Sequence, residues 1–225
     1  MPGTIVADSL DAMDPAAVQA ELASAREAVE AEPPDARLQA QVEMGLAADI
    51  ARIHEYAAQA GPDDEFVKAN QHVLLDDGRS LSAREALAAA ATGTETWTCG
   101  GSANLTGVVM WALGGTVIFA PPLAFMFGAA GGPDWALGGF ASGIAGSFVV
   151  DPQKIRDNEM RQEGSAVGTV YKGSCKFQLG SLGAGAGAIR LSFYSNSGTY
   201  WGLLGGVTGG VGGASLSGQC DLVWS

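Results

Sequence analysis

Apolar residues recur at helical spacing early in the chain and form two stripes. Asp14 followed by Pro15 gives a helix start before the first stripe, and Asp35 precedes the second. Pro33-Pro34 separates the stripes, and Gly61-Pro62 ends the second. The stripes are Val18, Leu22, Ala25 and Val29, then Leu38, Val42, Leu46, Ile50, Ile53 and Ala57. The pattern predicts two amphipathic helices that pack on each other as an antiparallel hairpin.

Helical signals continue with less regularity as far as residue 95. Residues 63–75 predict a short helix, with a strand-like run at its end, before the turn at Asp76-Asp77-Gly78. Ser82 and Glu85 form a capping box, so another helix is expected to begin at Ser82 and to end at Gly93. We assign residues 1–95 to an acidic helical domain.

The pattern changes at residue 96, because residues 96–133 contain no charged residue. A transmembrane helix is one interpretation of such a run. Gly114-Gly115 and Pro121-Pro122 interrupt it, however, and each remaining segment is short and rich in β-branched or aromatic residues. These segments are residues 108–113, 116–120 and 123–127. The pattern favours strands paired around Gly114-Gly115 over a membrane-spanning helix.

The rest of the chain continues in strand-sized segments. Residues 135–150 predict one or two strands, residues 151–164 a capped helix or polar loop, and residues 167–171 and 174–179 two further strands. Residues 189–194 and 199–204 flank the polar turn Ser195-Asn196-Ser197-Gly198, which is typical of a β-hairpin. The total is about eight strands, and the frequent glycines permit strong sheet curvature. The predicted fold is α+β, with the helical domain followed by a Gly-rich antiparallel β-barrel over residues 96–225.

Strands in this region do not alternate between apolar and polar residues, so both faces of the sheet need cover. One face can fill a barrel, and the other must meet helices, another subunit or lipid. The large apolar residues of these strands form a candidate interaction surface: Val109, Trp111, Leu113, Phe119, Phe125, Phe127 and Trp201.

Charge is divided unevenly between the two regions. Residues 1–95 contain 18 acidic and 6 basic residues, and residues 96–225 contain 6 of each, so the net charge of -12 lies in the first region. This acidity argues against binding to nucleic acid. The first residues have no basic segment followed by an apolar one, so no secretory signal is expected. We expect a cytoplasmic protein, or one exported by a non-classical or specialised route.

No catalytic constellation is visible in the sequence. Two histidines, His54 and His72, are too few for a histidine metal site and are expected to face solvent. The three cysteines, Cys99, Cys175 and Cys220, fit no metal spacing and are expected to be buried and apolar, the alternative being a Cys175 to Cys220 bridge. The glycine runs complete no phosphate-binding motif. We therefore expect no enzymatic activity, no cofactor and no bound metal.

The segment FYSNSGTYWG, residues 193–202, resembles the penultimate hairpin of the virulence-associated (Vap) proteins of actinobacteria. The glycine-rich tail with tryptophan near its end is similar as well. The resemblance covers residues 96–225 and implies a compact eight-stranded antiparallel barrel with no enzymatic activity, acting on membranes or compartment maturation in the host phagosome. The chain departs from the family in its helical region, in its three cysteines, and in having Leu204 where the family tends to have glutamine.

These observations together suggest a non-enzymatic, effector-like protein whose apolar barrel surface engages membrane lipid or a protein partner. The acidic helices would cover that surface, and acidification would neutralise their carboxylates and loosen the cover. Two alternatives are a soluble barrel that binds a small lipid-like ligand and a structural homo-oligomer.

Overall fold

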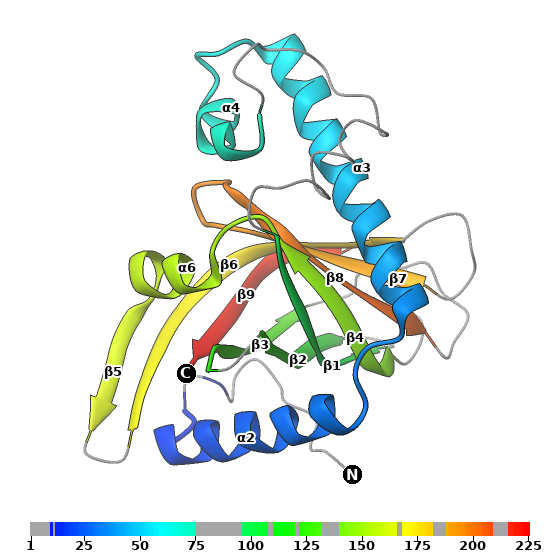
Figure 1. Ribbon diagram of the computed structural model, residues 1–225. Coiled ribbons are helices and arrows are strands. Elements are labelled where there is room, and N and C mark those ends of the chain that lie inside the picture. The colour runs from blue at the N-terminus through cyan, green and yellow to red at the C-terminus, as the bar shows by residue number, and fades with distance from the viewer. Residues whose placement is uncertain are drawn as a thin grey trace.

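In the computed structural model a β-barrel follows a group of N-terminal helices (Figure 1). The structure describes residues 10, 12–74, 96–107, 110–119, 122–131, 140–165, 168–181, 188–208 and 216–225. The strands are β1 (Trp97–Gly107), β2 (Trp111–Ile118), β3 (Ala124–Gly131), β4 (Phe140–Phe148), β5 (Arg161–Ser165), β6 (Gly168–Ser181), β7 (Ala188–Tyr194), β8 (Tyr200–Thr208) and β9 (Leu216–Trp224). The helices are α2 (Pro15–Ala31), α3 (Ala36–Ala60), α4 (Glu65–Ala69), a 3₁₀ turn (Gln71–Val73) and α6 (Pro152–Glu159).

Eight of the strands close into an antiparallel barrel. Neighbours around the ring are β6-β7-β8-β4-β1-β2-β3-β9, and the pairing of β9 with β6 completes it. The prediction of an α+β fold with a barrel of about eight strands is therefore confirmed. The ring divides into two four-stranded Greek keys, β4-β1-β2-β3 and β8-β7-β6-β9. Two seams join the keys, one between β3 and β9 and the other between β4 and β8.

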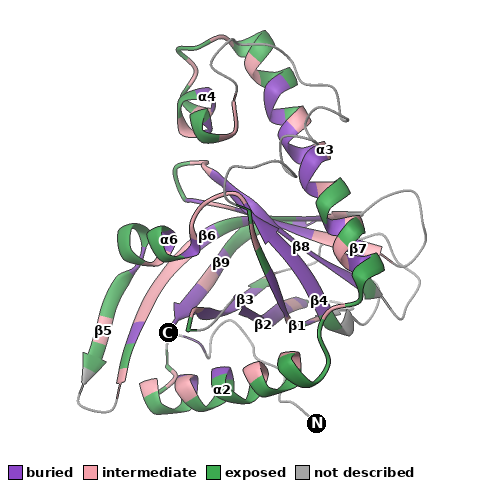
Figure 2. Cartoon of the chain, in the orientation of Figure 1, coloured by how far each residue is buried: buried purple, intermediate pink, exposed green. Residues whose placement is uncertain are grey.

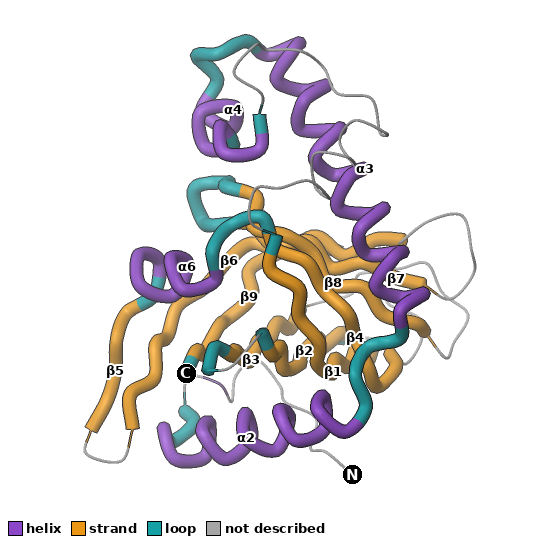
Figure 3. Tube along the Cα trace, viewed as in Figure 1, coloured by secondary structure: helices purple, strands orange, loops and turns teal. Residues whose placement is uncertain are grey.

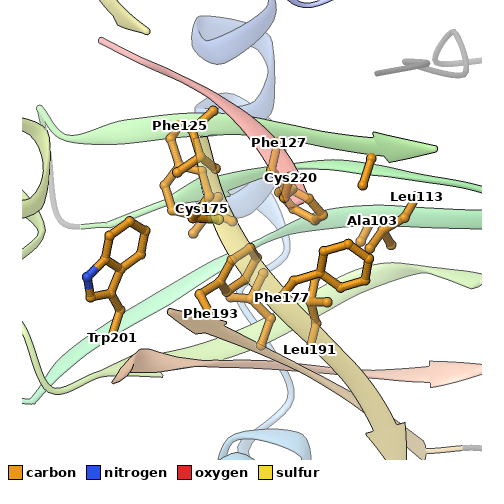
Figure 4. Close-up of a cluster of buried hydrophobic side chains, with 14 of the residues drawn as sticks. Ala103, Leu113, Phe125, Phe127, Cys175, Phe177, Leu191, Phe193, Trp201 and Cys220 are labelled. Carbon is orange, nitrogen blue, oxygen red and sulfur yellow. The ribbon is translucent and has the colours of Figure 1, made fainter. Parts of the chain in front are cut away.

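The barrel interior is filled by side chains. Strand residues alternate between the two faces, so that Phe125 and Phe127 of β3 point inward while Met126 points outward. Phe193 and Phe177 belong to the same inner cluster, which includes seven large aromatic rings that are 2% exposed or less (Figure 4). These rings are Phe125, Phe127, Phe148, Phe177, Phe193, Trp201 and Trp224. Burial of the interior accounts for one of the two apolar faces.

The other apolar face is covered by the helices. Val18 and Leu22 of α2 pack with barrel residues including Met126 and Val223, and Leu46 and Ile50 of α3 belong to a second cluster. That second cluster contains the barrel residues Ala145, Tyr200 and Leu203. The purple inner sides of both helices in Figure 2 show this burial. We call α2 and α3 in these positions the helical cover.

The predicted antiparallel hairpin of α2 and α3 is wrong. The two helices have their main contacts with strands rather than with each other, and they lie on different parts of the barrel surface (Figure 3). The amphipathic stripes fixed which side of each helix is buried, but the barrel offers each stripe an apolar surface of its own. Each helix also spans a seam, since α2 contacts strands from β2 and β3 to β6, and α3 contacts both β4 and β8.

The predicted turn at Gly114-Gly115 is also wrong, because both residues lie within β2. A side chain at Gly115 would place its Cβ 2.3 Å from the Ser102 carbonyl oxygen on β1 and 2.8 Å from the Phe127 ring. The glycine therefore serves close packing inside the sheet and not chain reversal. The reversal occurs near Pro122, where the Phe119 N–H donates to the Leu123 carbonyl at 3.0 Å.

The hairpin of β7 and β8 is confirmed. Its turn is closed by the Ser195 N–H donating to the Thr199 carbonyl at 2.8 Å, and Gly198 has φ of 97°. Gly202, the last residue of the segment that resembles the Vap hairpin, has φ of 154° and lies so close to β4 that a Cβ would be 2.4 Å from the Ser147 oxygen. This part of the motif is thus a packing requirement of the barrel.

Other segments agree with the sequence in part. The two strands predicted at residues 167–171 and 174–179 form one long strand, β6, as far as they lie within the described residues 168–181, and β5 pairs with the start of β6 outside the barrel ring. The capped helix predicted after Asp151 is α6, and the short helix predicted after Asp63 is α4. The helix predicted at Ser82 lies outside the described residues. Among the described helices, none has both the length and the apolar character needed to cross a bilayer.

Candidate functional site

The large apolar residues that the sequence marks as a candidate interaction surface are in the barrel interior. Trp111, Leu113, Phe119, Phe125, Phe127 and Trp201 all belong to the inner cluster and are 6% exposed or less. Val109 lies outside the described residues. The reason is strand parity, because the outward positions belong to neighbours such as Ile118, Met126 and Leu203. In this conformation, these three outward residues lie beneath the helical cover.

An open cleft of about 910 Å³ lies between α3 and the outer face of β6, β7 and β9. We call it the α3 cleft. Asp49, Arg52, Ile53 and Tyr56 line it from α3, at the spacing that places side chains on one helix face. The barrel contributes outward residues of β6, β7 and β9, and Phe66 of α4 and Gly198 also line it. The strand residues are Lys176, Gln178, Arg190, Tyr194, Ser217 and Gln219, together with the edge of Phe177 beside Gly218.

Asp49 anchors α3 to the barrel at one side of the α3 cleft. Its carboxylate is 6% exposed and accepts hydrogen bonds from Arg190 Nη1 at 2.7 Å, Ser192 Oγ at 2.9 Å and Tyr200 Oη at 3.1 Å. Arg52 Nη1, one turn further along α3, lies 3.7 Å from the same carboxylate. These bonds satisfy a charge that would be costly to bury alone. We call this group the Asp49 network.

The two tyrosines beside Asp49 are held in their neutral form. Burial first, and then the Asp49 charge, raises the pKa of Tyr194 to about 12, although Arg190 and Arg52 oppose the shift. Burial and Asp49 raise the pKa of Tyr200 well above its ordinary value. The rings of Tyr194 and Tyr200 lie 5.3 Å apart. Both phenols are therefore hydrogen-bond donors at neutral pH and are not poised as bases.

A second set of bonds fixes the α4 end of the cleft to the β7–β8 hairpin. Asn70 is fully buried; its Nδ2 donates to the Phe66 and Gly198 carbonyls at 2.8 and 2.9 Å, and its Oδ1 accepts from the Tyr200 N–H at 2.7 Å. His72 Nε2 lies 2.9 Å from the Tyr200 carbonyl. This segment therefore closes one end of the cleft as a fixed wall.

The expectation that both histidines face solvent is wrong for His54 and holds only in part for His72, an exposed residue whose ring nitrogen lies against a barrel carbonyl. His54 is 3% exposed, and its Nε2 lies 2.8 Å from the Val73 carbonyl. His54 follows Ile53 on the buried side of α3. Its imidazole can occupy a position typical of an aliphatic side chain because its polar nitrogen has a backbone partner. Both histidines thus make structural contacts with backbone carbonyls, His54 with Val73 in the segment after α4 and His72 with Tyr200 of β8.

The cysteines are free and buried, as expected. Cys175 and Cys220 are direct partners in the β6–β9 register and face the barrel interior (Figure 4). Burial is the main cause that raises the pKa of Cys175 and of Cys99. Such thiols are poor nucleophiles at neutral pH. Within the described residues, no group of three or more histidine, cysteine or acidic side chains is arranged to hold a metal ion.

Sequence reasoning missed the α3 cleft and its central residue, Asp49. A signal was present, because Asp49 occupies the i+3 position between Leu46 and Ile53 on an otherwise apolar stripe. A carboxylate at such a position needs a buried partner. The stripe could have identified the need, but not Arg190, which is 141 residues away in the sequence.

No family model matches the chain, and no curated protein matches it. Among solved structures, the chain is similar to the virulence-associated protein VapB from the intracellular pathogen Rhodococcus equi. The sequence identity is 17% and the TM-score 0.34, and the match covers 58% of this chain and 96% of that chain. A Vap protein is therefore among the structural neighbours of this α+β barrel.

Proposed function

We propose that the protein is a non-enzymatic, effector-like protein whose barrel binds a lipid surface when its helical cover is displaced. One observation carries the proposal. The barrel has a filled interior of its own, and the helices hide two further apolar areas on its outside. Displacing the helices would therefore expose apolar surface without emptying the barrel core.

The hidden areas have the character that lipid binding requires. Beneath α2 lie Ile118, Ala124, Met126, Val170 and Val223, and beneath α3 lie Ala145, Tyr200 and Leu203. Contiguous apolar areas of this kind are rarely left exposed to water and are typical of membrane or protein interaction sites. Exposing them in water would be unfavourable, so the covered state is the resting state in this proposal.

The charge distribution supports a role for acidification. The acidic excess lies in the helical region, while residues 96–225 carry equal numbers of acidic and basic residues. Protonation of carboxylates at low pH would remove negative charge from the helical region and so change the electrostatics of the cover. We expect lipid binding to increase as the pH falls.

A leakage assay with dye-loaded vesicles tests the proposal on the full chain. Leu22→Ala and Leu46→Ala remove buried side chains at the cover, and Leu113→Ala removes one of the same type from the barrel interior. All three substitutions should destabilise the protein by about 2–5 kcal/mol. Leakage should rise for the two cover variants, most strongly at acidic pH, and not for Leu113→Ala. Equal leakage from all three would show that unfolding, and not displacement of the cover, is responsible.

A further inference from the structure

We infer that the α3 cleft is a binding site for an amphipathic anion, a molecule with one negatively charged head and an apolar body. The inference does not depend on the proposed function, because the cleft is open in the covered state. Its volume of about 910 Å³ is within the range of small-molecule sites. The cleft lies outside the barrel, and the barrel interior itself is filled.

The charged groups of the cleft specify an anionic head. Among the described residues that line it are three cations, Arg52, Lys176 and Arg190, and one carboxylate, Asp49. Arg190 and Arg52 share that carboxylate, at 2.7 and 3.7 Å, and within the described part of the chain Lys176 forms no ion pair. The lining thus carries a local positive excess in a chain with a net charge of -12. Arginine and lysine side chains in this arrangement suit a carboxylate or phosphate.

The Asp49 network keeps these cations in place before a ligand arrives. The Arg190 side chain is only 18% exposed and is held by its short bond to Asp49. Arg52 is 66% exposed and lies at the longer distance, so it is free to turn toward a second anion. A site whose donors are already ordered loses less entropy on binding.

Aromatic residues supply the apolar part of the site. Tyr56 and Phe66 meet edge to face at 5.3 Å, and Tyr56 is 45% exposed although it is a large ring. Tyr194 lies on the floor, beside Lys176 across the β6–β7 register. Exposed rings next to an excess of cations favour a ligand with an apolar body attached to its charged head.

Isothermal titration of the full-length protein with decanoate, below its micelle concentration, tests the inference. Decanol and decyltrimethylammonium have the same alkyl chain with a neutral and a positive head. We expect decanoate to bind and the other two to bind at least about tenfold more weakly. Equal binding of all three would overturn the assignment of an anion site.

The double variant R52Q/K176Q should weaken decanoate binding by about tenfold or more while circular dichroism stays unchanged. K154Q/R161Q is the matched control, since it removes two exposed cations on α6 and β5, outside the cleft, and should bind decanoate as the wild type does. The substitution S217W, which places a bulky side chain in the cleft wall, should abolish decanoate binding. Retention of full affinity in R52Q/K176Q would refute the proposed role of these cations.

A free amphipathic acid and an anionic lipid headgroup both present a negative charge attached to an apolar body. A vesicle-binding experiment distinguishes between them. Sedimentation with phosphatidylglycerol vesicles, compared with phosphatidylcholine vesicles, reports a headgroup in a bilayer. If R52Q/K176Q loses vesicle binding and the wild type shows no affinity for decanoate, the anion is a lipid headgroup. Decanoate binding without vesicle binding identifies a free acid. Absence of both from the folded wild type would overturn the inference.

Discussion

Removal of the Asp49 carboxylate is expected to weaken the attachment of α3 to the barrel more than any exposed substitution on that helix. In Asp49→Ala, the Tyr200 and Ser192 hydroxyls, both in buried residues, lose their acceptor, and Arg190 loses its ion-pair partner. An unsatisfied buried hydroxyl costs about 1–3 kcal/mol. The partly buried Arg190 adds to this, since breaking a fully buried ion pair by removing one partner costs about 3–5 kcal/mol.

The Arg190 side chain is 18% exposed, so water can partly replace the lost carboxylate. We therefore expect a total loss of about 3–5 kcal/mol in the free energy of unfolding. Asp49→Asn keeps an acceptor and should cost less. Glu43→Ala, at an exposed position on the same helix, should stay within about 0.5 kcal/mol of the wild type.

Urea unfolding followed by circular dichroism measures these differences, and amide hydrogen exchange shows where the protection is lost. The loss should concentrate in α3 and in the β7–β8 hairpin. A loss below about 1 kcal/mol for Asp49→Ala would refute the argument, since it would mean that the buried donors find other partners.

Three further predictions follow from the same structure. Gly202→Ala should destabilise the protein by more than about 2 kcal/mol in urea unfolding, because the new Cβ would meet β4 backbone at 2.4 Å; a neutral result would mean that β4 and β8 can separate at little cost. Cys99, Cys175 and Cys220 should react slowly with a thiol reagent in the native protein and quickly after unfolding; fast native labelling would contradict their burial. Burial lowers the pKa of His72 below its ordinary 6.5, so the unfolded chain binds the proton more readily. The stabilising effect of the neutral ring is then present above about pH 6.5 and is lost as pH falls through the folded-state pKa. The free energy of unfolding should drop less between about pH 7 and pH 5 in His72→Gln than in the wild type.

The sequence predicted those features that depend on local chemistry. The turn at Ser195 and Gly198 was predictable because its polar residues and its positive-φ glycine lie side by side between two strand-forming runs. Helix starts at Asp14 and Asp35 were predictable for the same reason, and each side chain does accept a bond from the second residue after it. The barrel followed from the number and length of the strands.

The orientation of the strands was not predictable, because the local signal was missing. Phe125 and Met126 are adjacent, and both are apolar and buried, yet one faces the interior and the other faces α2. Side chains of a strand alternate between its two faces, but without polar residues on one face the sequence does not show which set points outward. For this reason the expected interaction surface named inward residues.

The α3 cleft was not predictable because it depends on distant parts of the chain. Asp49, Arg190 and Tyr200 meet only when α3 lies across the barrel, and no spacing in the sequence relates them. The helical stripe indicated that one side of α3 is buried but not against what. Because the stripes do not identify the surface that each helix packs against, the prediction of a helical hairpin was also wrong.

The position of each helix across a seam has a mechanical consequence. Among the described residues, the strands of the two Greek keys pair with each other at the β3–β9 and β4–β8 seams, and the first seam is short, with residues 125–128 of β3 in register and one further bond from the Ser225 N–H to the Ala124 carbonyl. Separating the two Greek keys at either seam would require the helix that lies across that seam, α2 or α3, to slide or detach first. Each helix thus reinforces the seam that it crosses. Detachment of one helix therefore lowers the force needed to separate the strands at that seam.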